Sequence, residues 1–378
     1  MIIGGGIAGA GAAYELAAFA QVALLEREAR CGYHSTGRSA ASFTENYGGT
    51  LVRRLAIASR PFLEDPPRGF CAHPLLAERG TLTIARADQI ELLERQLEDA
   101  RALVVPSIVP IEAARALERV PILRREYLAG AYLEPHAMEL DVNALHQGFL
   151  GAARARGAQI VVNAGVQAIE RCGERWRVDT QAGSFRAPLI VNAAGAWADT
   201  VATLAGVRPL GLTPKRRTAF NVAAPAGVEI RRWPMVNDVG EEFYFKPDAG
   251  QLFVSPADAT PSPPMDAYPD DLDVALGVER LERATTLTVR RVTRSWAGLR
   301  SFVADGLPVA GPDEDAEGFF WLAGQGGYGI KTSPALSRAC AGLIRERQLP
   351  EELSRLGISA SALSPARLHR AASPGAGA

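Results

Sequence analysis

Short aliphatic runs that lead through glycine-rich turns into helices rich in alanine and leucine occur three times along the chain. They occupy residues 2–26, 158–206 and 302–344. A buried strand followed by a glycine turn and a helix is typical of βα units, in which parallel strands lie side by side. We therefore expect these three regions to build one α/β unit.

The two intervening regions have different patterns. Residues 88–104 are predicted to form an amphipathic helix, whose apolar residues at helical spacing are Ile90, Leu93, Leu97 and Ala100. Residues 243–254 read FYFKPDAGQLFV, and the turn residues PDAG between two apolar runs predict a β-hairpin. These regions indicate a second unit with a more antiparallel sheet.

The chain of 378 residues is longer than one hydrophobic core usually organises, so two domains are expected. The predicted fold class is α/β, or α+β overall. We expect a discontinuous nucleotide-binding domain and a mainly antiparallel domain that interrupts it twice, with the active site in the cleft between them. The expected bounds are 1–74, 136–209 and 299–363 for the first domain, 75–135 and 210–298 for the second, and 364–378 for a disordered tail rich in Ala, Pro and Gly.

The composition excludes several classes of protein. The formal net charge of −1 argues against a nucleic-acid-binding surface, which would be basic. The scattered cysteines form no C-x-x-C pair, so we expect a reducing compartment, no disulfide framework and no metal site. No apolar run reaches the about 18 residues of a membrane span, and no signal peptide is recognisable. We expect a cytoplasmic protein; peripheral membrane association stays open, as does a native start upstream of Met1.

The first glycine-rich turn has the spacing Gly4-x-Gly6-x-x-Gly9 between a short strand and a helix predicted for residues 10–18. Gly4 allows the tight turn, Gly6 allows close approach to a pyrophosphate, and Gly9 allows the helix to pack on the strand. Glu26 ends the next strand, where an acid binds the ribose hydroxyls of an adenosine. The alternative is a structural turn with a solvated acid. The pattern predicts a dinucleotide but does not separate NAD from FAD.

Several longer strings carry a family resemblance that covers nearly the whole chain. They are HSTGRSAA at 34–41, VNAAGAW at 191–197, PKRR at 214–217, FYFKPDAG at 243–250, WAGLRSFVADG at 296–306 and GQGGYGIKT at 324–332. With them the chain resembles the glycine/D-amino-acid oxidase (DAO) family of FAD-dependent flavoproteins, and within it the bacterial D-amino-acid dehydrogenases of the D-arginine dehydrogenase type. The resemblance implies a Rossmann-like FAD-binding domain and a second, antiparallel-sheet substrate-binding domain.

The resemblance also implies how FAD is held. Ser35, Thr36, Arg38 and Ser39 are expected at the pyrophosphate and flavin, and the backbone of Val166 at the adenine. The glycines of 324–329 bring backbone N–H groups to the flavin, and the next helix N-terminus, with Lys331, stabilises negative charge there. No cysteine or histidine stands where some relatives tether flavin, so non-covalent binding is expected. Besides Gly4, Gly6, Gly9 and Glu26, the expected cofactor contacts are Ile7, Ala8, Arg27, Ser35, Thr36, Arg38, Ser39, Ala40, Ala41, Val166, Ala194, Gly195, Trp197, Arg300, Gly326, Gly327, Tyr328, Gly329, Ile330, Lys331 and Thr332.

An amino-acid substrate needs a clamp for its carboxylate, and an arginine fork binds a carboxylate at two points. The resemblance implies Arg217 and Arg300 for this role, although the basic run 215–217 taken alone favours a solvated face. Tyr244 alternates with two phenylalanines, so it points to the cleft if they face the core. Tyr47 lies in a glycine-containing loop, resembles the lid tyrosine of the family and is expected to exclude water.

The side-chain end of the expected pocket departs from the relatives that prefer D-arginine. Those relatives carry an acid where Thr81 stands here, a larger polar residue at Ser42 and a neutral amide at Lys331. A threonine does not neutralise a buried guanidinium, so we expect neutral, apolar substrates to be preferred. The expected pocket residues are Ser42, Thr81, Met235, Gly327 and Lys331.

These features predict oxidative deamination of a D-amino acid to a 2-oxo acid and ammonia, with hydride transfer from Cα to flavin N5. The resemblance implies a dehydrogenase that passes electrons to a quinone or another acceptor. Two alternatives stay open: an oxygen-using oxidase of glycine, sarcosine or D-amino acids, and an electron-transfer flavoprotein subunit without its own substrate. A nicotinamide dehydrogenase would need a second nucleotide pocket where the cap domain is expected.

Overall fold

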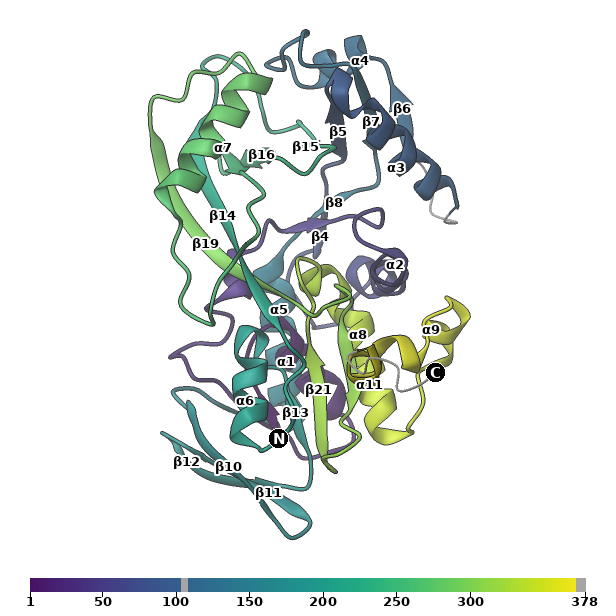
Figure 1. Cartoon of the computed structure of the whole chain (residues 1–378), viewed down its shortest axis with the longest axis vertical. Coiled ribbons are helices and arrows are strands. Elements are labelled where there is room, and N and C mark those ends of the chain that lie inside the picture. Colours follow the sequence, from purple (N-terminus) through teal and green to yellow (C-terminus); the bar gives the residue numbers. More distant parts are fainter. Residues whose placement is uncertain (103–107, 372–378) are drawn as a thin grey trace, which may run out of the picture.

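A six-stranded sheet forms the centre of the lower part of the molecule (Figure 1) in the computed structural model, which describes residues 1–102 and 108–371. The strand order is β20-β21-β13-β1-β2-β9, and all neighbours are parallel except β20 and β21. The sheet is therefore the mixed sheet expected of a Rossmann-like domain. The strands are β1 Ile2–Ile3, β2 Ala23–Leu25, β9 Gln159–Val161, β13 Ile190–Asn192, β20 Val309–Pro312 and β21 Phe319–Ala323.

Both faces of this sheet are covered. On one face helix α1 lies against α5 and α8, and α2 lies against α8. On the other face, α6 and the small sheet β10-β11-β12 share an apolar cluster with the central strands. The bounds are α1 Ile7–Leu16, α2 Thr50–Glu64, α5 Val142–Ala155, α6 Ala198–Leu204, α8 Gly329–Arg345, β10 Val166–Cys172, β11 Arg175–Thr180 and β12 Gly183–Ala187, with short 3-10 turns at Ser35–Arg38 and Gly195–Trp197.

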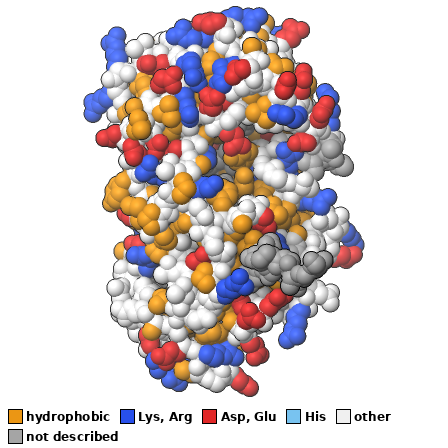
Figure 2. Space-filling view, viewed as in Figure 1, with side chains coloured by type: hydrophobic (Ala, Val, Ile, Leu, Met, Phe, Trp, Pro, Cys, Tyr) orange, Lys and Arg blue, Asp and Glu red, His pale blue; other side chains and the backbone are white. Residues whose placement is uncertain are grey.

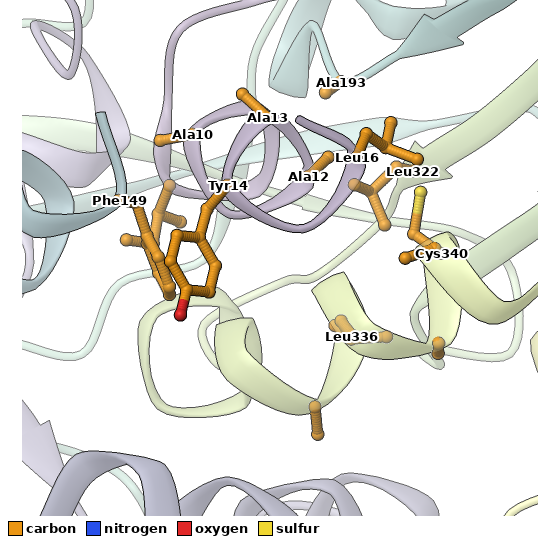
Figure 3. Packing of buried hydrophobic residues seen from close by; sticks show 14 of the residues in the cluster. Ala10, Ala12, Ala13, Tyr14, Leu16, Phe149, Ala193, Leu322, Leu336 and Cys340 are labelled. Atoms are coloured by element: carbon orange, nitrogen blue, oxygen red, sulfur yellow. The ribbon is translucent and has the colours of Figure 1, made fainter. Parts of the chain in front are cut away.

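Helix α1 is apolar on nearly all sides because its neighbours enclose it. Eight of its ten residues are buried, so the helix has no solvated face of any width. Figure 3 shows Tyr14 directed toward Phe149 of α5, with ring centroids 5.4 Å apart. Gly11 lets α8 approach closely, since an added Cβ would lie 2.1 Å from Ser337 Oγ. The small residues of α1 therefore allow helices to pack tightly around the first glycine turn.

A larger sheet forms the upper part, in the order β18-β14-β17-β16-β15-β5-β7-β6, with β19 paired to β14. Among the described strands of this sheet, only β5 and β15 are parallel neighbours. An apolar cluster between this sheet and helices α4 and α7 forms a second core. The bounds are β5 Thr81–Ala85, β6 Val109–Ile111, β7 Gly130–Glu134, β14 Thr213–Ala223, β15 Met235–Asp238, β16 Tyr244–Asp248, β17 Gln251–Ser255, β18 Thr260–Pro261, β19 Val292–Phe302, α3 Ile90–Ala102, α4 Ala113–Arg119 and α7 Asp271–Ala284, with a 3-10 turn at Ala87–Gln89.

Two 11-residue strands, β14 and β19, run as an antiparallel pair from the upper sheet into the lower part (Figure 1). Their register pairs Lys215 with Arg300 and Arg217 with Gly298. Directly paired residues, and residues two apart on one strand, share a face of the sheet, so Arg217 and Arg300 are on the same face. Between the two parts lies a three-stranded sheet made of β3 Ser42–Phe43, β8 Met138–Leu140 and β4 Leu76–Glu78.

The two-part fold confirms the predicted class. The predicted hairpin is β16–β17, and its turn residues Ala249 and Gly250 both have positive φ, +47° and +79°, as a tight hairpin turn requires. The predicted helix 88–104 begins as a 3-10 turn and continues as α3; its residues 103 and 104 lie outside the described part. Strands β5–β7 and β14–β18 come from the ranges assigned to the second domain, and β19 begins in them and ends beyond residue 298; the domain bounds stay a prediction.

The expectation of a disordered tail from residue 364 onward is wrong for its first half. Residues Ala366–Ala371 form helix α11, which follows α9 Glu351–Arg355 and α10 Ala360–Leu363. Arg367 explains the order: its guanidinium binds the Asp305 carboxylate and the carbonyl of Leu307. Residues 372–378 lie outside the described part. In residues 1–102 and 108–371, no helix combines the length and the apolar character needed to cross a membrane.

Candidate functional site

A cavity of about 460 Å³ opens where the parallel strands β1, β2 and β13 end. In open α/β sheets ligands bind at the carboxyl ends of the strands, so the cavity lies where a nucleotide is expected. Figure 2 shows hydrophobic side chains gathered around a hollow between the two parts. The expected cofactor residues that line the cavity are Gly4, Gly6, Ile7, Ala8, Glu26, Arg27, Ser35, Thr36, Ser39, Val166, Ala194, Gly195, Trp197, Arg300, Gly326, Gly327, Gly329 and Ile330.

Glycine is required at each of the three positions of the first turn for a different physical reason. Gly4 has φ of +107°, and a Cβ there would lie 2.4 Å from the carbonyl oxygen of Ala193. Gly9 lies outside the cavity, and its Cβ would lie 1.9 Å from the Gly4 carbonyl oxygen, so helix and turn pack directly on each other. Gly6 lines the cavity, and the nearest atom to its added Cβ is Thr36 Oγ1 at 3.4 Å. Gly6 therefore leaves room for a ligand rather than for neighbouring protein.

Glu26 and Thr36 order the residues around this turn. The Glu26 carboxylate is 7% exposed and accepts hydrogen bonds from the backbone N–H groups of Gly5 at 2.8 Å and Glu28 at 2.9 Å. Thr36 Oγ1 accepts a hydrogen bond from the Ile7 N–H at 2.9 Å, where α1 begins. These bonds hold an acid and the open end of a helix at the same cavity, an arrangement suited to a ribose next to a phosphate.

Several expected cofactor residues lie outside the cavity, and Arg38 differs most from the expectation. Its guanidinium donates to the carbonyls of Ala267 and Ala297 and to the Asp266 carboxylate at 2.5 Å. The acid in segment 260–268 draws the side chain away from the cavity toward the second part of the molecule. Besides Gly9, the other expected residues that do not line the cavity are Ala40, Ala41, Tyr328, Lys331 and Thr332.

The candidate clamp residues come together around Arg300, which lines the cavity, whereas Tyr47, Arg217 and Tyr244 are not among the lining residues. Arg300 lines the cavity and donates to the carbonyl of Arg38 at 2.6 Å, and burial lowers its pKa to about 10, partly opposed by Tyr244. Arg217 donates to the carbonyl of Asp258 at 2.7 Å; burial opposes its charge, but Tyr244 and Tyr47 raise its pKa above the ordinary value. These four side chains are therefore close enough to act on each other electrostatically.

Arg300 has space around its guanidinium, and neither Arg217 nor Arg300 has an ion-pair partner among the described residues. Gly298 stands opposite Arg217, and a Cβ on it would lie 2.7 Å from an Arg300 guanidinium nitrogen, so the glycine makes space for that guanidinium. Within residues 1–102 and 108–371, neither Arg217 nor Arg300 has a carboxylate oxygen within 4 Å. Two partly buried cations without ion-pair partners favour an anionic ligand beside them.

The two candidate tyrosines, Tyr244 and Tyr47, contact different neighbouring groups. Tyr244 stacks on Phe253 with ring centroids 6.0 Å apart, whereas Phe243 and Phe245 are buried in the core, so the expected alternation is confirmed. Tyr47 lies 5.3 Å from the ring of Tyr328, and its hydroxyl donates to Glu241 at 3.5 Å. Glu241, at the tip of the β15–β16 turn, was not expected at this site from the sequence.

The pocket residues Thr81 and Met235 lie side by side on neighbouring strands, and Glu134 is the third member of this row. Thr81 is 4% exposed, and its hydroxyl has no hydrogen-bond partner in the described part of the chain. Both Glu134 oxygens accept from the Thr44 hydroxyl, at 2.8 and 2.7 Å, and burial raises the Glu134 pKa. The sequence signal for Glu134 is an acid that ends the apolar run 131–133.

Ser42, Gly327 and Lys331 have different surroundings. Gly327 lines the cavity with nothing within 4 Å of an added Cβ. Ser42 pairs with Glu139, whose carboxylate is held by Arg79 and Lys246. Lys331 is not among the residues that line the cavity, and its Nζ donates to the carbonyl oxygens of Thr44 and Tyr47. Over the described residues, no group of three or more His, Cys, Asp or Glu side chains is arranged to hold a metal ion.

Comparisons with known proteins agree with this geometry. The family profile described as FAD dependent oxidoreductase (DAO) matches residues 1–343. The glycine oxidase of Geobacillus kaustophilus (strain HTA426) is 27% identical over 95% of this chain and 96% of its own. Human mitochondrial sarcosine dehydrogenase is 26% identical over 87% of this chain, which spans only 38% of that protein. The crystal structure of L-proline dehydrogenase from P. horikoshii matches with a TM-score of 0.83 at 22% identity, over 98% of this chain and 97% of the other, which shows a shared fold.

Proposed function

This chain belongs to the FAD-dependent oxidoreductase (DAO) family, and from that premise we propose that it oxidises the amine of a D-amino acid to give a 2-oxo acid and ammonia. The observation that carries the proposal is the pair of arginines, Arg217 and Arg300, without ion-pair partners in the described chain beside the cavity. An amino acid supplies the carboxylate that this pair lacks.

The residues of the cavity fit FAD. Gly6 and Gly327 leave open space where a Cβ would intrude on a ligand, and Glu26 is held ready for a ribose by two backbone N–H groups. Segment 325–330, which the family resemblance assigns to the flavin, lines the cavity with a glutamine, glycines and an isoleucine. A glutamine, a glycine and an isoleucine offer no nucleophile for a covalent bond to flavin, so we infer non-covalent binding.

The polar groups of the proposed site bind and orient the substrate. When bound, FAD accepts the two electrons and the hydrogen that leave Cα. Arg217 and Arg300 bind the carboxylate and so fix the orientation of Cα, while Tyr244 adds a hydroxyl to the clamp. Tyr47 and Tyr328 cover this end of the site and exclude water. Hydrolysis of the imine product then releases ammonia.

The side-chain end favours neutral substrates. Thr81 and Met235 offer a methyl group, a hydroxyl and a thioether chain, which suit an apolar side chain. A buried apolar side chain contributes about 0.8 kcal/mol per methylene, whereas an unpaired buried cation is costly. We therefore propose preference for apolar D-amino acids over D-arginine, with a quinone or a similar acceptor taking the electrons.

A second candidate function is oxidation of glycine or of a secondary amine such as sarcosine or proline, with oxygen as one acceptor. The names of the similar proteins favour it, since they include glycine oxidase, sarcosine dehydrogenase and L-proline dehydrogenase. An electron-transfer subunit without its own substrate is the weaker alternative, because it gives no role to the arginine pair.

Anaerobic flavin reduction separates these functions. The holoenzyme is mixed with D- and L-leucine, D-arginine, glycine, sarcosine and L-proline, and bleaching of the flavin is recorded. We expect D-leucine to bleach it fastest. Faster reduction by glycine, sarcosine or L-proline would support the second candidate function instead. If none of the tested amino acids reduces the flavin, the electron-transfer subunit is the function that stays. Peroxide formation under air then distinguishes an oxidase from a dehydrogenase.

Two glycine variants test the cofactor cradle. Gly6→Ala is expected to weaken FAD binding by about 5- to 150-fold, from the ~1–3 kcal/mol of overpacking, with normal stability of the FAD-free protein. Gly9→Ala is expected to weaken FAD binding and also to lower the stability of the FAD-free protein, because the added Cβ would lie 1.9 Å from a carbonyl oxygen. FAD titration and thermal unfolding measure both effects, and Gly151→Ala on α5, with open space around it, is the control. Full FAD occupancy in dilute Gly6→Ala protein would contradict the cradle.

A further inference from the structure

In the loop between β3 and α2, residues 44–48 are fastened by side chains. Hydrogen bonds between backbone groups do not hold these residues within the described chain. Lys331 Nζ donates to the carbonyl oxygen of Thr44 at 2.8 Å and to that of Tyr47 at 2.6 Å. Arg53 Nε donates to the carbonyl oxygen of Gly48 at 2.7 Å. The position of this loop therefore depends on a few long side chains.

Tyr47 is the residue of this loop that reaches the proposed substrate site. Its ring contacts Tyr328, its hydroxyl donates to Glu241, and its presence raises the pKa of Arg217. Lys331 Nζ lies 5.4 Å from the centre of the Tyr47 ring and holds the backbone of the same residue. Lys331 thus holds the backbone of Tyr47, while the hydroxyl of Tyr47 lies near Glu241 and its side chain near Arg217.

The surroundings of Lys331 are unfavourable for a charged amine. The side chain is 4% exposed and lies in the first turn of α8, where the helix dipole disfavours a cation. Burial lowers the pKa of Lys331 to about 7, an effect that Glu134 opposes. A neutral amine carries two protons, which match the two carbonyl acceptors. An apolar side chain would fill this space without desolvation, so the amine is explained by the carbonyls it holds.

Thr44 is held from a second direction. Its hydroxyl donates to the buried carboxylate of Glu134 and accepts from the Asn46 N–H at 3.1 Å. The carbonyl of Thr44 is bound by Lys331, so helix α8 and strand β7 meet at this residue. The loop is therefore tied to both parts of the molecule at once.

We propose that Lys331 is a positioning residue that holds Tyr47 over the substrate site by binding the carbonyl groups of Thr44 and Tyr47. The role of Tyr47 rests on the proposed function, whereas the fixing of the loop does not. Without Lys331 the loop samples open positions, and the apparent substrate affinity falls in proportion to the closed fraction. The effect is therefore expected in KM rather than in FAD binding or in the chemistry of the flavin.

The test compares the holoenzyme with its Lys331→Met and Ser333→Ala variants. Methionine keeps the length of the side chain and removes the donors; Ser333 lies in the same turn of α8, where its hydroxyl donates only to the Ile330 carbonyl at 2.9 Å. In Lys331→Met, we expect amide hydrogen exchange in residues 45–49 to rise about 10- to 100-fold, from the loss of two hydrogen bonds. We expect KM to rise by a similar factor, with kcat within about threefold and an unchanged flavin reduction potential.

Two further variants test the same proposal if Lys331→Met does not fold. Lys331→Gln keeps an amide donor and is expected to restore part of the protection of residues 45–49. Thr44→Val removes the bond to Glu134 and is expected to loosen the same segment. Unchanged exchange and KM in the Lys331 variants would overturn the proposal, as would a shifted flavin potential with unchanged exchange, which would return Lys331 to the cofactor. If no amino acid reduces the flavin, the exchange measurement still decides whether Lys331 fixes the loop.

Discussion

Replacing Arg300 by alanine is expected to lower kcat/KM for the best amino-acid substrate by about 30- to 4,000-fold. Truncating one partner of a buried, hydrogen-bonded charge pair costs ~2–5 kcal/mol, and each ~1.4 kcal/mol is tenfold. Arg300 is the clamp residue that both lines the cavity and lies on the face of β14–β19 that carries Arg217. Its loss removes half of the clamp and leaves the substrate carboxylate without its fork.

The loss is expected in the rate of flavin reduction. Arg300→Lys should recover only part of it, because a point charge replaces a planar fork. FAD content must be measured in parallel, since Arg300 also binds the carbonyl of Arg38 at 2.6 Å. Arg294→Ala is the matched control, because Arg294 is an exposed arginine of the same strand that lies over Trp296. Wild-type flavin reduction by the Arg300→Ala variant would remove this residue from the site.

Thr81→Glu is expected to raise the preference for D-arginine over D-leucine, as a ratio of kcat/KM values, by about 10- to 100-fold. Thr81 itself offers a guanidinium no charge, and an unpaired cation in a desolvated site costs several kcal/mol. Thr81→Gln has nearly the same shape without the charge, so it should leave the ratio low. Steady-state kinetics with both substrates measure the effect.

The acids near Thr81 decide whether this reasoning holds. Glu45 is paired with Arg60 at 2.6 Å, and Glu139 is held by Arg79 and Lys246. Glu134 stands opposite Thr81, but its oxygens are occupied by the Thr44 hydroxyl, and Lys331 lowers its pKa against the effect of burial. These carboxylates are already engaged. If D-arginine proves the best substrate of the unmodified enzyme, Glu134 or the exposed Glu241 serves the substrate after all and the account of Thr81 is wrong.

The sequence predicts the fold and the dinucleotide cradle because their signals are local. Gly4, Gly6 and Gly9 lie within one turn, and their spacing alone implies a tight turn and a close helix; the family resemblance predicts FAD, which the family match confirms. The hairpin β16–β17 is equally local, since its turn needs two residues with positive φ. Such features depend on neighbours within a few residues.

Side-chain directions that depend on distant partners were not predictable in the same way. Arg38 binds Asp266 and Lys331 binds the carbonyl groups of residues 44 and 47, and neither side chain is among those that line the cavity. Glu134 faces Thr81 only through the strand register. The tail was misjudged for the same reason, since Arg367 is ordered by Asp305. The roles of the clamp and pocket residues stay predictions.

The register of β14 and β19 limits which changes in length the enzyme tolerates. Arg217 faces the site because it pairs with Gly298, and the neighbouring Arg216 faces the opposite side, toward Asp273. Deleting one residue between the start of β14 and Arg217 would shift the alternation and exchange these two arginines while keeping a paired, basic strand. We therefore expect insertions and deletions to be tolerated only at the ends of the β14–β19 pair. A change in chain length moves the clamp arginines only if it disrupts the hydrogen-bonded pairing of these two strands.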